Sequence, residues 1–369
     1  MAERIRHEAW RVALWWAFGI ALVLVASVAA FAAYLMLPVS TPPFRDAGGN
    51  VLPDSIASIE RWKLNGISQS VLLRGRRVSN PILIWVHGGP GTSETPLFRH
   101  YNGTLEEHFL VVYWDQRYAG QSLDPFGEKP AHEYTSEYVS DLSALVERIC
   151  ARFHRNKVVI VAHSWGTVPG ILYVEGHPGR VAAYVGIGQV ADTLASEKLS
   201  FAFVLNAARA RGNTADVSRL LRLGPPPRRA GDNFTPRDLL IRYGGSFHAD
   251  IGLGTLALVT LGSSEANWRD FAAFAMIADF NTLAMKDLSG AVLDEQHTLF
   301  GVPVFFVSGR YDHQVDASLA YRYFQKVTAP EKSFVWFEHS AHGPPFEEPG
   351  KFNAWMTRTV LPLAAQNSH

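Results

Sequence analysis

The sequence holds a single cysteine among 369 residues, and this scarcity excludes several kinds of structure. The one thiol, Cys150, cannot form a disulfide within the chain or build a cysteine-based metal site. Elsewhere, no spacing of His, Asp and Glu is typical of a metal site, so we expect no metal and no cofactor. Excess charge is also absent, because 34 Lys and Arg balance 34 Asp and Glu. We therefore expect no nucleic-acid partner.

Long apolar segments, by contrast, are present. Hydrophobic residues make up 47% of the chain, which is enough for one large domain, or one and a half, with its own core. Residues 12–37 hold no charged side chain and exceed the roughly 20 residues that a membrane-spanning helix needs. Arginines at positions 4, 6 and 11 precede this run. The positive-inside rule therefore predicts that residues 1–11 are cytoplasmic and that the chain after the run lies on the non-cytoplasmic side of the membrane.

A cleaved signal peptide is the alternative interpretation of this run, since Ala30-Phe31-Ala32 resembles a small-residue cleavage site. The apolar run is longer than the 7–15 residues of a signal-peptide core, which favours a retained anchor over residues 12–37. Residues 38–55 are rich in Pro, Gly, Ser and Thr and predict a tether.

The remainder of the chain shows the pattern of an α/β domain with an insertion. Residues 56–73 alternate around Asn65-Gly66, which predicts a β-hairpin. Short apolar runs then predict strands at 81–86, 109–114, 158–163, 181–187, 302–309 and 334–337, with a helix at 134–154. Between 190 and 299 the pattern becomes helical. We therefore expect a core in two parts, 56–189 and 300–369, separated by a helical cap over 190–299.

Ser164 occupies the most informative turn in the sequence. The β-branched run Val158–Val161 leads into Ala162-His163-Ser164-Trp165-Gly166, and a helical pattern follows. This arrangement is similar to the G-x-S-x-G nucleophile turn, with Ala162 in place of the first glycine. A serine after a strand can also be a simple helix N-cap.

Three further stretches also follow predicted strands. They are His87-Gly88-Gly89-Pro90-Gly91, a segment containing Asp312 and a segment containing His342. Because the carboxyl ends of parallel strands share one edge, Ser164, Asp312 and His342 are expected to meet there. Their order along the chain is that of an α/β-hydrolase. His339 and Asp316 are the rival base and acid; His339 lies closer to its strand, and Asp316 lies deeper in the loop.

These residue types suit nucleophilic catalysis. A histidine base takes the proton of the serine hydroxyl, and an aspartate fixes the histidine tautomer and stabilises the imidazolium. The developing oxyanion needs donors in place beforehand, and we expect the backbone N–H groups of Gly89 and Trp165 to supply them. The sequence therefore predicts a serine hydrolase.

The same stretches resemble the proline iminopeptidase branch of the α/β-hydrolases. The resemblance is carried by residues 87–91, by Asp115-Gln116-Arg117 with Gly120 and Ser122, and by Ser164-Trp165-Gly166. It implies a mostly parallel eight-stranded sheet flanked by helices, an inserted helical cap, and removal of an N-terminal residue, usually proline, from short peptides. It assigns Ser164, Asp312 and His342 to the triad, and Gly89 and Trp165 to the oxyanion hole.

The sequence departs from this family where the substrate amine would bind. The peptidases hold that amine with cap glutamates, often near a Trp-Glu pair, whereas this chain has Trp268-Arg269. Glu197 and Glu265 are candidates by location alone. Two other functions therefore stay open: a membrane-anchored esterase or amidase acting on small apolar substrates, and a non-catalytic binding module. An epoxide hydrolase or dehalogenase would need an aspartate where Ser164 stands.

Overall fold

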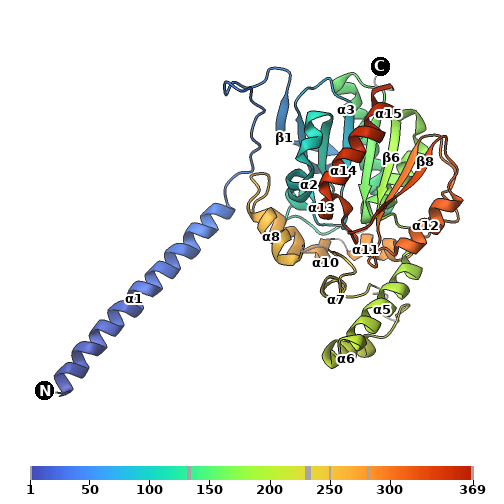
Figure 1. Ribbon diagram of the computed structural model, residues 1–369. Helices are drawn as coiled ribbons and strands as arrows, with labels where there is room; N and C mark the ends of the chain where they lie inside the picture. Colours follow the sequence, from blue (N-terminus) through green and yellow to red (C-terminus); the bar gives the residue numbers. More distant parts are fainter. Residues whose placement is uncertain (1, 131–133, 229–233, 249–250, 281, 367–369) are drawn as a thin grey trace. The chain divides into compact units, whose positions relative to one another are not determined.

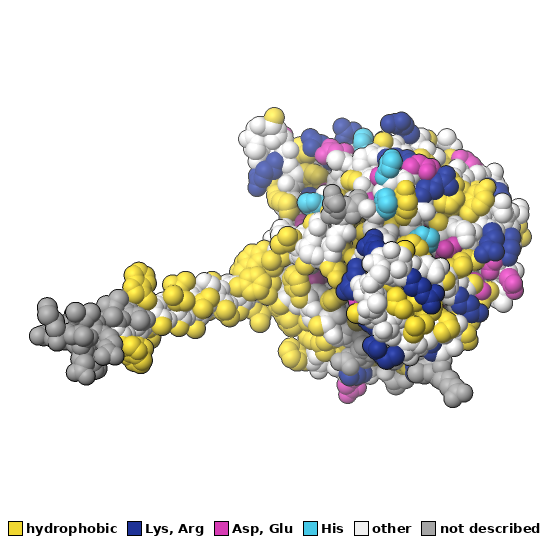
Figure 2. Space-filling view, turned by 60° about the horizontal axis from the view of Figure 1, so that its bottom comes forward, with side chains coloured by type: hydrophobic (Ala, Val, Ile, Leu, Met, Phe, Trp, Pro, Cys, Tyr) yellow, Lys and Arg dark blue, Asp and Glu magenta, His cyan; other side chains and the backbone are white. Residues whose placement is uncertain are grey.

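The computed structural model describes residues 2–130, 134–228, 234–248, 251–280 and 282–366. The chain forms two compact units, Met1–Val39 and Ser40–His369. The first is the helix α1 (Ala2–Leu35) with the residues that follow it. Within α1, Leu14–Leu35 has a mean hydropathy of 2.4 and is long and apolar enough to cross a membrane, a test that a signal sequence near the N-terminus also passes. Figure 2 shows its apolar side chains in yellow.

The second unit is built on one eight-stranded sheet, which confirms the expected fold class (Figure 1). The strand order is β1-β2-β4-β3-β5-β6-β7-β8, and the strands are Ile56–Leu64, Ile67–Gly75, Ile82–Val86, Leu110–Asp115, Val158–His163, Val181–Ile187, Val304–Gly309 and Lys332–Phe337 for β1 to β8. β1, β2 and β4 pair antiparallel, and all other neighbours pair parallel. The predicted hairpin is β1–β2, closed by the pair Leu64 and Ile67.

Helices cover both faces of this sheet because both faces of its central strands are apolar. In β3, Ile84 belongs to a core with α3 (Thr135–Phe153), α4 (Thr167–Gly176) and α12 (Ala317–Lys326). Its neighbour Trp85 points to the opposite face and belongs to a core with α2 and the C-terminal helices. Those elements are α2 Thr95–Asn102, α13 Pro344–Glu347, α14 Pro349–Trp355, a π-helical turn Met356–Val360 and α15 Leu361–Gln366.

Between β6 and β7 the regular elements of the described chain are all α-helices, joined by loops. The helices are α5 Thr193–Ala210, α6 Thr214–Leu223, α7 Arg237–Arg242, α8 Leu253–Leu261, α9 Trp268–Ala275, α10 Ile277–Phe280 and α11 Thr282–Ser289. Residues of α5, α6 and α7 form a small core of their own. Because this segment leaves β6 and rejoins the sheet at β7, it begins at the edge of the sheet where the strands end (Figure 1).

Short 3-10 turns complete the fold and connect strands to helices. They are Gly103–Glu107, Gly120–Ser122, Ser164–Gly166 and Pro178–Arg180. The third of these turns lies between β5 and α4 and holds the candidate nucleophile.

Candidate active site

Ser164 lies at a strained turn between β5 and α4. β5 ends at His163, and Ser164 has φ +52°, in the left-handed region that residues with a side chain rarely adopt. The turn approaches β3 so closely that a Cβ on Gly166 would lie 2.2 Å from the carbonyl oxygen of Val86. Only glycine fits there, which is the physical reason for the glycine two residues after the serine. Such strain, about 1–3 kcal/mol, persists where the surrounding structure fixes the turn.

His342 and Asp312 form a buried hydrogen-bonded pair. His342 Nδ1 lies 2.9 Å from Asp312 Oδ2, and both side chains are at most 5% exposed. The other carboxylate oxygen, Oδ1, accepts the backbone N–H groups of Gln314 and Val315, each at 3.0 Å. Asp312 is therefore held from two sides, and its contact with Nδ1 leaves Nε2 as the nitrogen that can act as a base.

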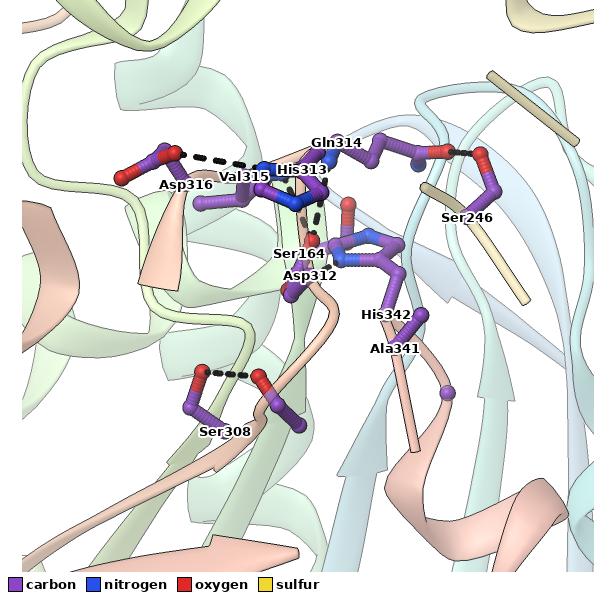
Figure 3. Close-up of polar contacts among 12 residues, drawn as sticks. Ser164, Ser246, Ser308, Asp312, His313, Gln314, Val315, Asp316, Ala341 and His342 are labelled. Carbon is purple, nitrogen blue, oxygen red and sulfur yellow. Dashed lines mark hydrogen bonds and ion pairs between the residues drawn. The ribbon is translucent and has the colours of Figure 1, made fainter. Parts of the chain in front are cut away.

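Ser164 lies beside this pair (Figure 3). In the described part of the chain, His342 Nε2 is buried and has no hydrogen-bond partner. The serine hydroxyl is thus not hydrogen-bonded to Nε2 in this state. Catalytic hydrogen bonds often tighten only when a substrate is bound, so this geometry is compatible with a Ser-His-Asp arrangement.

Gly188 is a site residue that the sequence analysis missed. It follows β6 with φ +54°, and a Cβ there would lie 2.8 Å from His342 Cε1 and 2.9 Å from Nδ1. The absence of a side chain at Gly188 therefore makes room for the imidazole ring. In the sequence, Gly188 is only a glycine directly after a predicted strand. A glycine has no reactive side chain, so nothing marked it as a site residue.

His163 and Glu94 form a second buried histidine–carboxylate pair next to Ser164. His163 Nδ1 lies 2.7 Å from Glu94 Oε1, and His163 Nε2 lies 2.8 Å from the backbone carbonyl oxygen of His342. Both oxygens are acceptors, so only a doubly protonated ring can donate to both. Burial alone would lower the pKa of His163, but the Glu94 carboxylate raises it above the usual value. His163 in turn holds the pKa of Glu94 below its usual value, against the effect of burial.

Gln116 fixes the glycine-rich loop that follows β3. Its Nε2 donates to the carbonyl oxygen of His87 (2.7 Å), and its Oε1 accepts the indole N–H of Trp165 (3.0 Å). Gly88 N–H donates to Glu94 Oε2 at 3.0 Å. Among the described residues, the N–H of Gly89 has no acceptor. Trp165 stands at a helix start, where backbone N–H groups are not used by the helix itself.

Asp115 and Arg117 brace this region through separate partners and not through a salt bridge with each other. The Asp115 carboxylate accepts the hydroxyls of Ser93 and Thr95, at 2.5 and 2.7 Å. Arg117 pairs with Asp141 at 2.7 Å on α3. Asp115 therefore anchors the start of α2, whereas Arg117 joins the segment after β4 to α3.

The two cap glutamates are occupied by donors from the protein. Glu197 accepts from the N–H of Thr235 and from Arg237 Nη2, each at 2.7 Å. Glu265 accepts the hydroxyls of Thr41 (3.0 Å) and Ser263 (2.9 Å). Across the described ranges, no hydrogen bond joins either glutamate to the candidate triad. The structure thus brings the triad together without bringing these two carboxylates to it.

Comparison with known proteins agrees with this fold. The model of the alpha/beta hydrolase fold family matches residues 81–223. The probable aminopeptidase YbaC of Bacillus subtilis is 28% identical over 314 residues, covering 82% of this chain and 96% of that protein. These matches support the assignment of the chain to the α/β-hydrolase superfamily. Within it, this hydrolase resembles the proline iminopeptidase branch, as the sequence motifs predicted: a probable proline iminopeptidase of Streptomyces coelicolor is 33% identical over 103 residues, covering 28% of this chain and 31% of that protein.

Solved structures share the fold at low sequence identity. A proline iminopeptidase-related protein from Thermus thermophilus superimposes with a TM-score of 0.57 and 17% identity, covering 85% of this chain and 99% of that one. A membrane phospholipase A superimposes with a TM-score of 0.55 and 17% identity, covering 98% of this chain and 99% of that one. These structures show the fold alone, whereas the family match and the likeness to YbaC support an enzyme of the α/β-hydrolase type.

Proposed function

We propose that this protein is a serine hydrolase in which Ser164 is the nucleophile, His342 the base and Asp312 the acid. The observation that carries the proposal is the 2.9 Å contact between His342 Nδ1 and Asp312 Oδ2, which leaves a buried, unpartnered Nε2. An aspartate bound to Nδ1 keeps the proton on that nitrogen, so Nε2 is free to take the proton of the serine.

The reaction would proceed in two steps, acylation of Ser164 and hydrolysis of the acyl-enzyme. Ser164 Oγ bonds to the carbonyl carbon as its proton passes to His342; the tetrahedral intermediate then expels the leaving amine or alcohol, which takes that proton, and an acyl-enzyme remains. Water then attacks the ester with the same base, and the acid product and free serine are released. The N–H groups of Gly89 and Trp165 would stabilise both oxyanions, a contribution typically worth about 10²–10³ in rate per donor.

For the substrate we propose the N-terminal residue of a short peptide. The support is the likeness to the probable aminopeptidase YbaC over most of both chains. Binding a peptide's free amine requires a carboxylate near the site, and Glu197 and Glu265 remain the candidates although both are engaged. That engagement favours a second candidate function, an esterase or amidase acting on small apolar substrates without a charged amine.

A fluorophosphonate probe tests the nucleophile. We expect the full-length protein to be labelled and Ser164→Ala to lose all labelling. Ser246→Ala is the matched control. Ser246 is a serine near the site, and its hydroxyl contacts only Gln314 among the described residues (Figure 3). Labelling of Ser164→Ala at the wild-type level would refute the assignment. No labelling of the wild type would instead favour the non-catalytic binding module.

A pair of substrates separates the two candidate functions. Purified protein would be given a proline arylamide and a short-chain aryl ester at equal concentrations, with Ser164→Ala as the blank. We expect cleavage of the arylamide. Rapid ester turnover without arylamide cleavage would eliminate the aminopeptidase and leave the esterase.

We further propose that α1 is a retained anchor that places the catalytic unit on the non-cytoplasmic side of a membrane. The support is its uncharged run, which is longer than a signal-peptide core, and the arginines that precede it. A C-terminal reporter that is active only outside the cytoplasm should be active. A mature protein that begins near residue 33 would show cleavage instead.

A further inference from the structure

The cap helix α8 (Leu253–Leu261) has an apolar face that points outward. None of its residues is buried, and the exposed ones are Leu253, Gly254, Ala257 and Leu258. At 100° per residue these four positions fall on one side of the helix. A surface helix ordinarily places polar side chains on that side, whereas the outer side of α8 is as apolar as the rest of the helix.

No charged residue interrupts this region. The sequence from 251 to 264 contains neither an acid nor a base. Leu258 is 69% exposed and Leu253 is 50% exposed, and Phe274 on the next helix in the chain, α9 (Trp268–Ala275), is 65% exposed. Single exposed apolar residues are common, but an uncharged helix with a wholly apolar outer face indicates a surface that is covered in the working protein.

The C-terminal end of α8 is tied to the residues that follow the N-terminal helix. Ser40 N–H donates to the carbonyl oxygen of Ser264 at 2.8 Å, and the Thr41 hydroxyl donates to Glu265 Oε1 at 3.0 Å. Arg74, itself buried, donates to the carbonyl oxygen of Pro42 at 2.8 Å and also contacts the Thr41 hydroxyl. Position 40 is thus fixed within a few residues of the end of α8.

The connection from this fixed point to α1 is short. α1 ends at Leu35, five residues before Ser40. A fully extended chain spans at most about 3.3–3.6 Å per residue, so these five steps reach no more than about 18 Å. If the end of α1 lies at a membrane surface, connectivity alone keeps the loop after α8 within that distance of the same surface.

We propose that the outer face of α8 contacts the lipid bilayer into which α1 inserts, with Leu253 and Leu258 in the interfacial region. The proposal rests on the membrane insertion of α1 proposed above. A short apolar helix held at a membrane surface can lie in the plane of the interface with its outer side chains about 5–10 Å deep. Because α8 belongs to the segment between β6 and β7, this contact turns the cap toward the bilayer.

A protein partner fits this surface less well than lipid does. A nine-residue helix is only about 13 Å long and about 10 Å wide. A stable protein interface buries roughly 800 Å² on each partner, far more than such a helix offers. A bilayer has no such requirement because α1 already holds the chain to it.

The lone, buried thiol of Cys150 makes a site-specific test possible. In a Cys150→Ala background, the full chain would carry one cysteine at a time, from Leu258→Cys, Leu221→Cys or Val25→Cys. Each would be labelled with the fluorophore NBD and reconstituted into phosphatidylcholine–phosphatidylglycerol vesicles. Lipids with shallow or deep doxyl quenchers would report depth. Leu221, which is 57% exposed on α6, is the matched control in the cap, and Val25 reports on α1.

We expect the label at 258 to be quenched most by the shallow doxyl group, the label at 25 by the deep one, and the label at 221 by neither. A label at 25 that is quenched beside a label at 258 that is not would refute the α8 contact and leave the anchor intact. A label at 25 that neither doxyl group quenches would refute both the anchor and the α8 contact. A blue-shifted but unquenched label at 258 would assign this face to another protein surface and overturn the proposal, as would equal quenching at 258 and 221.

Discussion

His163 Nε2 donates to the backbone carbonyl oxygen of His342 across 2.8 Å, so the residue before the candidate nucleophile supports the residue that would act as its base. The other ring nitrogen contacts Glu94, whose second oxygen accepts the N–H of Gly88. One charged pair therefore links the glycine-rich loop, the serine turn and the histidine loop. These segments are far apart in the sequence, and each contributes to the candidate site.

Replacing this histidine should reduce turnover more than substrate binding. His163→Gln carries its N–H donors on one nitrogen and cannot reach both oxygens as the two ring nitrogens do, so the loop that carries His342 should shift. A misplacement of about 1 Å can cost about 10²-fold in rate, and we expect kcat to fall by about 10- to 100-fold with KM changed less than threefold. The measurement is steady-state kinetics on the substrate that the paired assay identifies.

His297→Gln is the matched control. His297 Nδ1 lies 2.6 Å from Glu175 Oε2, so it forms the same kind of pair, but it is half-buried and bonded to neither loop of the site. Its kcat should stay within twofold of wild type. An equal loss of kcat in the two variants would mean that His163 affects turnover only by stabilising the fold, as any buried histidine–glutamate pair would.

The His163–Glu94 pair also predicts a limited pH range of stability. The pKa of His163 is raised, so its contribution is complete below about 6.5 and is lost as the pH rises through the raised value. The pKa of Glu94 is lowered, so its contribution is lost only as the pH falls below about 4.5. Melting curves should show His163→Gln losing most stability between these limits and approaching wild type at alkaline pH. A constant difference at every pH would contradict this coupling.

A methyl group at position 188 should displace the imidazole of His342. Gly188→Ala adds a Cβ 2.8 Å from His342 Cε1 and forces alanine into a positive φ. We expect kcat/KM to fall by about 100-fold or more. Gly212→Ala is the control for backbone strain alone, since Gly212 has φ +64° and nothing within 4 Å of its Cβ. Backbone strain should cost both variants about 1 kcal/mol of stability, and the clash should cost Gly188→Ala more, whereas only Gly188→Ala should lose activity. Equal activity in the two variants would show that the ring tolerates the methyl group.

The sequence contained enough to predict the edge of the sheet where the site forms. Apolar runs identified the central strands, and parallel strands place the residues that follow them along one edge, so Ser164, Asp312 and His342 could be associated without a structure. That association stays a prediction for catalysis. What the sequence did not reveal was the order of β3 and β4 in the sheet, because both are short apolar runs that look alike.

The supporting contacts could not be predicted because they depend on packing between distant segments. Glu94 and His163 are 69 residues apart, and neither lies in a pattern that indicates a partner. The occupancy of Glu197 and Glu265 likewise follows from how the cap and the Ser40–Pro42 segment pack, which periodicity does not encode. Gly188 becomes meaningful only when the imidazole is placed against it.

Gln116 should be needed for the stability of the site. Gln116→Met keeps the side chain's length but leaves the His87 carbonyl and the Trp165 indole N–H buried without their partner. Each such group costs about 1–3 kcal/mol, so the free energy of unfolding should fall by about 2–6 kcal/mol. Urea unfolding gives this value, and activity measured at low temperature shows whether the glycine-rich loop has also moved. A loss below 0.5 kcal/mol would mean that water replaces the amide.

Asp270 on α9 predicts that the cap is held more tightly at acidic pH. Its carboxylate accepts from Gln121 Nε2 at 2.6 Å and from the N–H of Asn267 at 2.9 Å. Burial, with the nearby Asp115 charge, raises the pKa of Asp270 to about 7. A raised pKa means that the folded state favours the protonated form, so this contribution is complete below about 3.8 and is lost as the pH rises through about 7.

Asp270→Asn replaces the acid with a neutral group that still offers an acceptor oxygen. We expect the melting temperature of the wild type to fall between pH 5 and pH 8 and that of the variant to fall less, so that the variant is the more stable protein at pH 8. Asp238→Asn is the opposite control: its hydrogen bond with Arg219 lowers the pKa of Asp238, so that removing the charge should weaken the fold slightly at pH 8. Parallel pH profiles for Asp270→Asn and wild type would show that Asp270 is already ionised in the folded protein at pH 5, which would contradict the raised pKa.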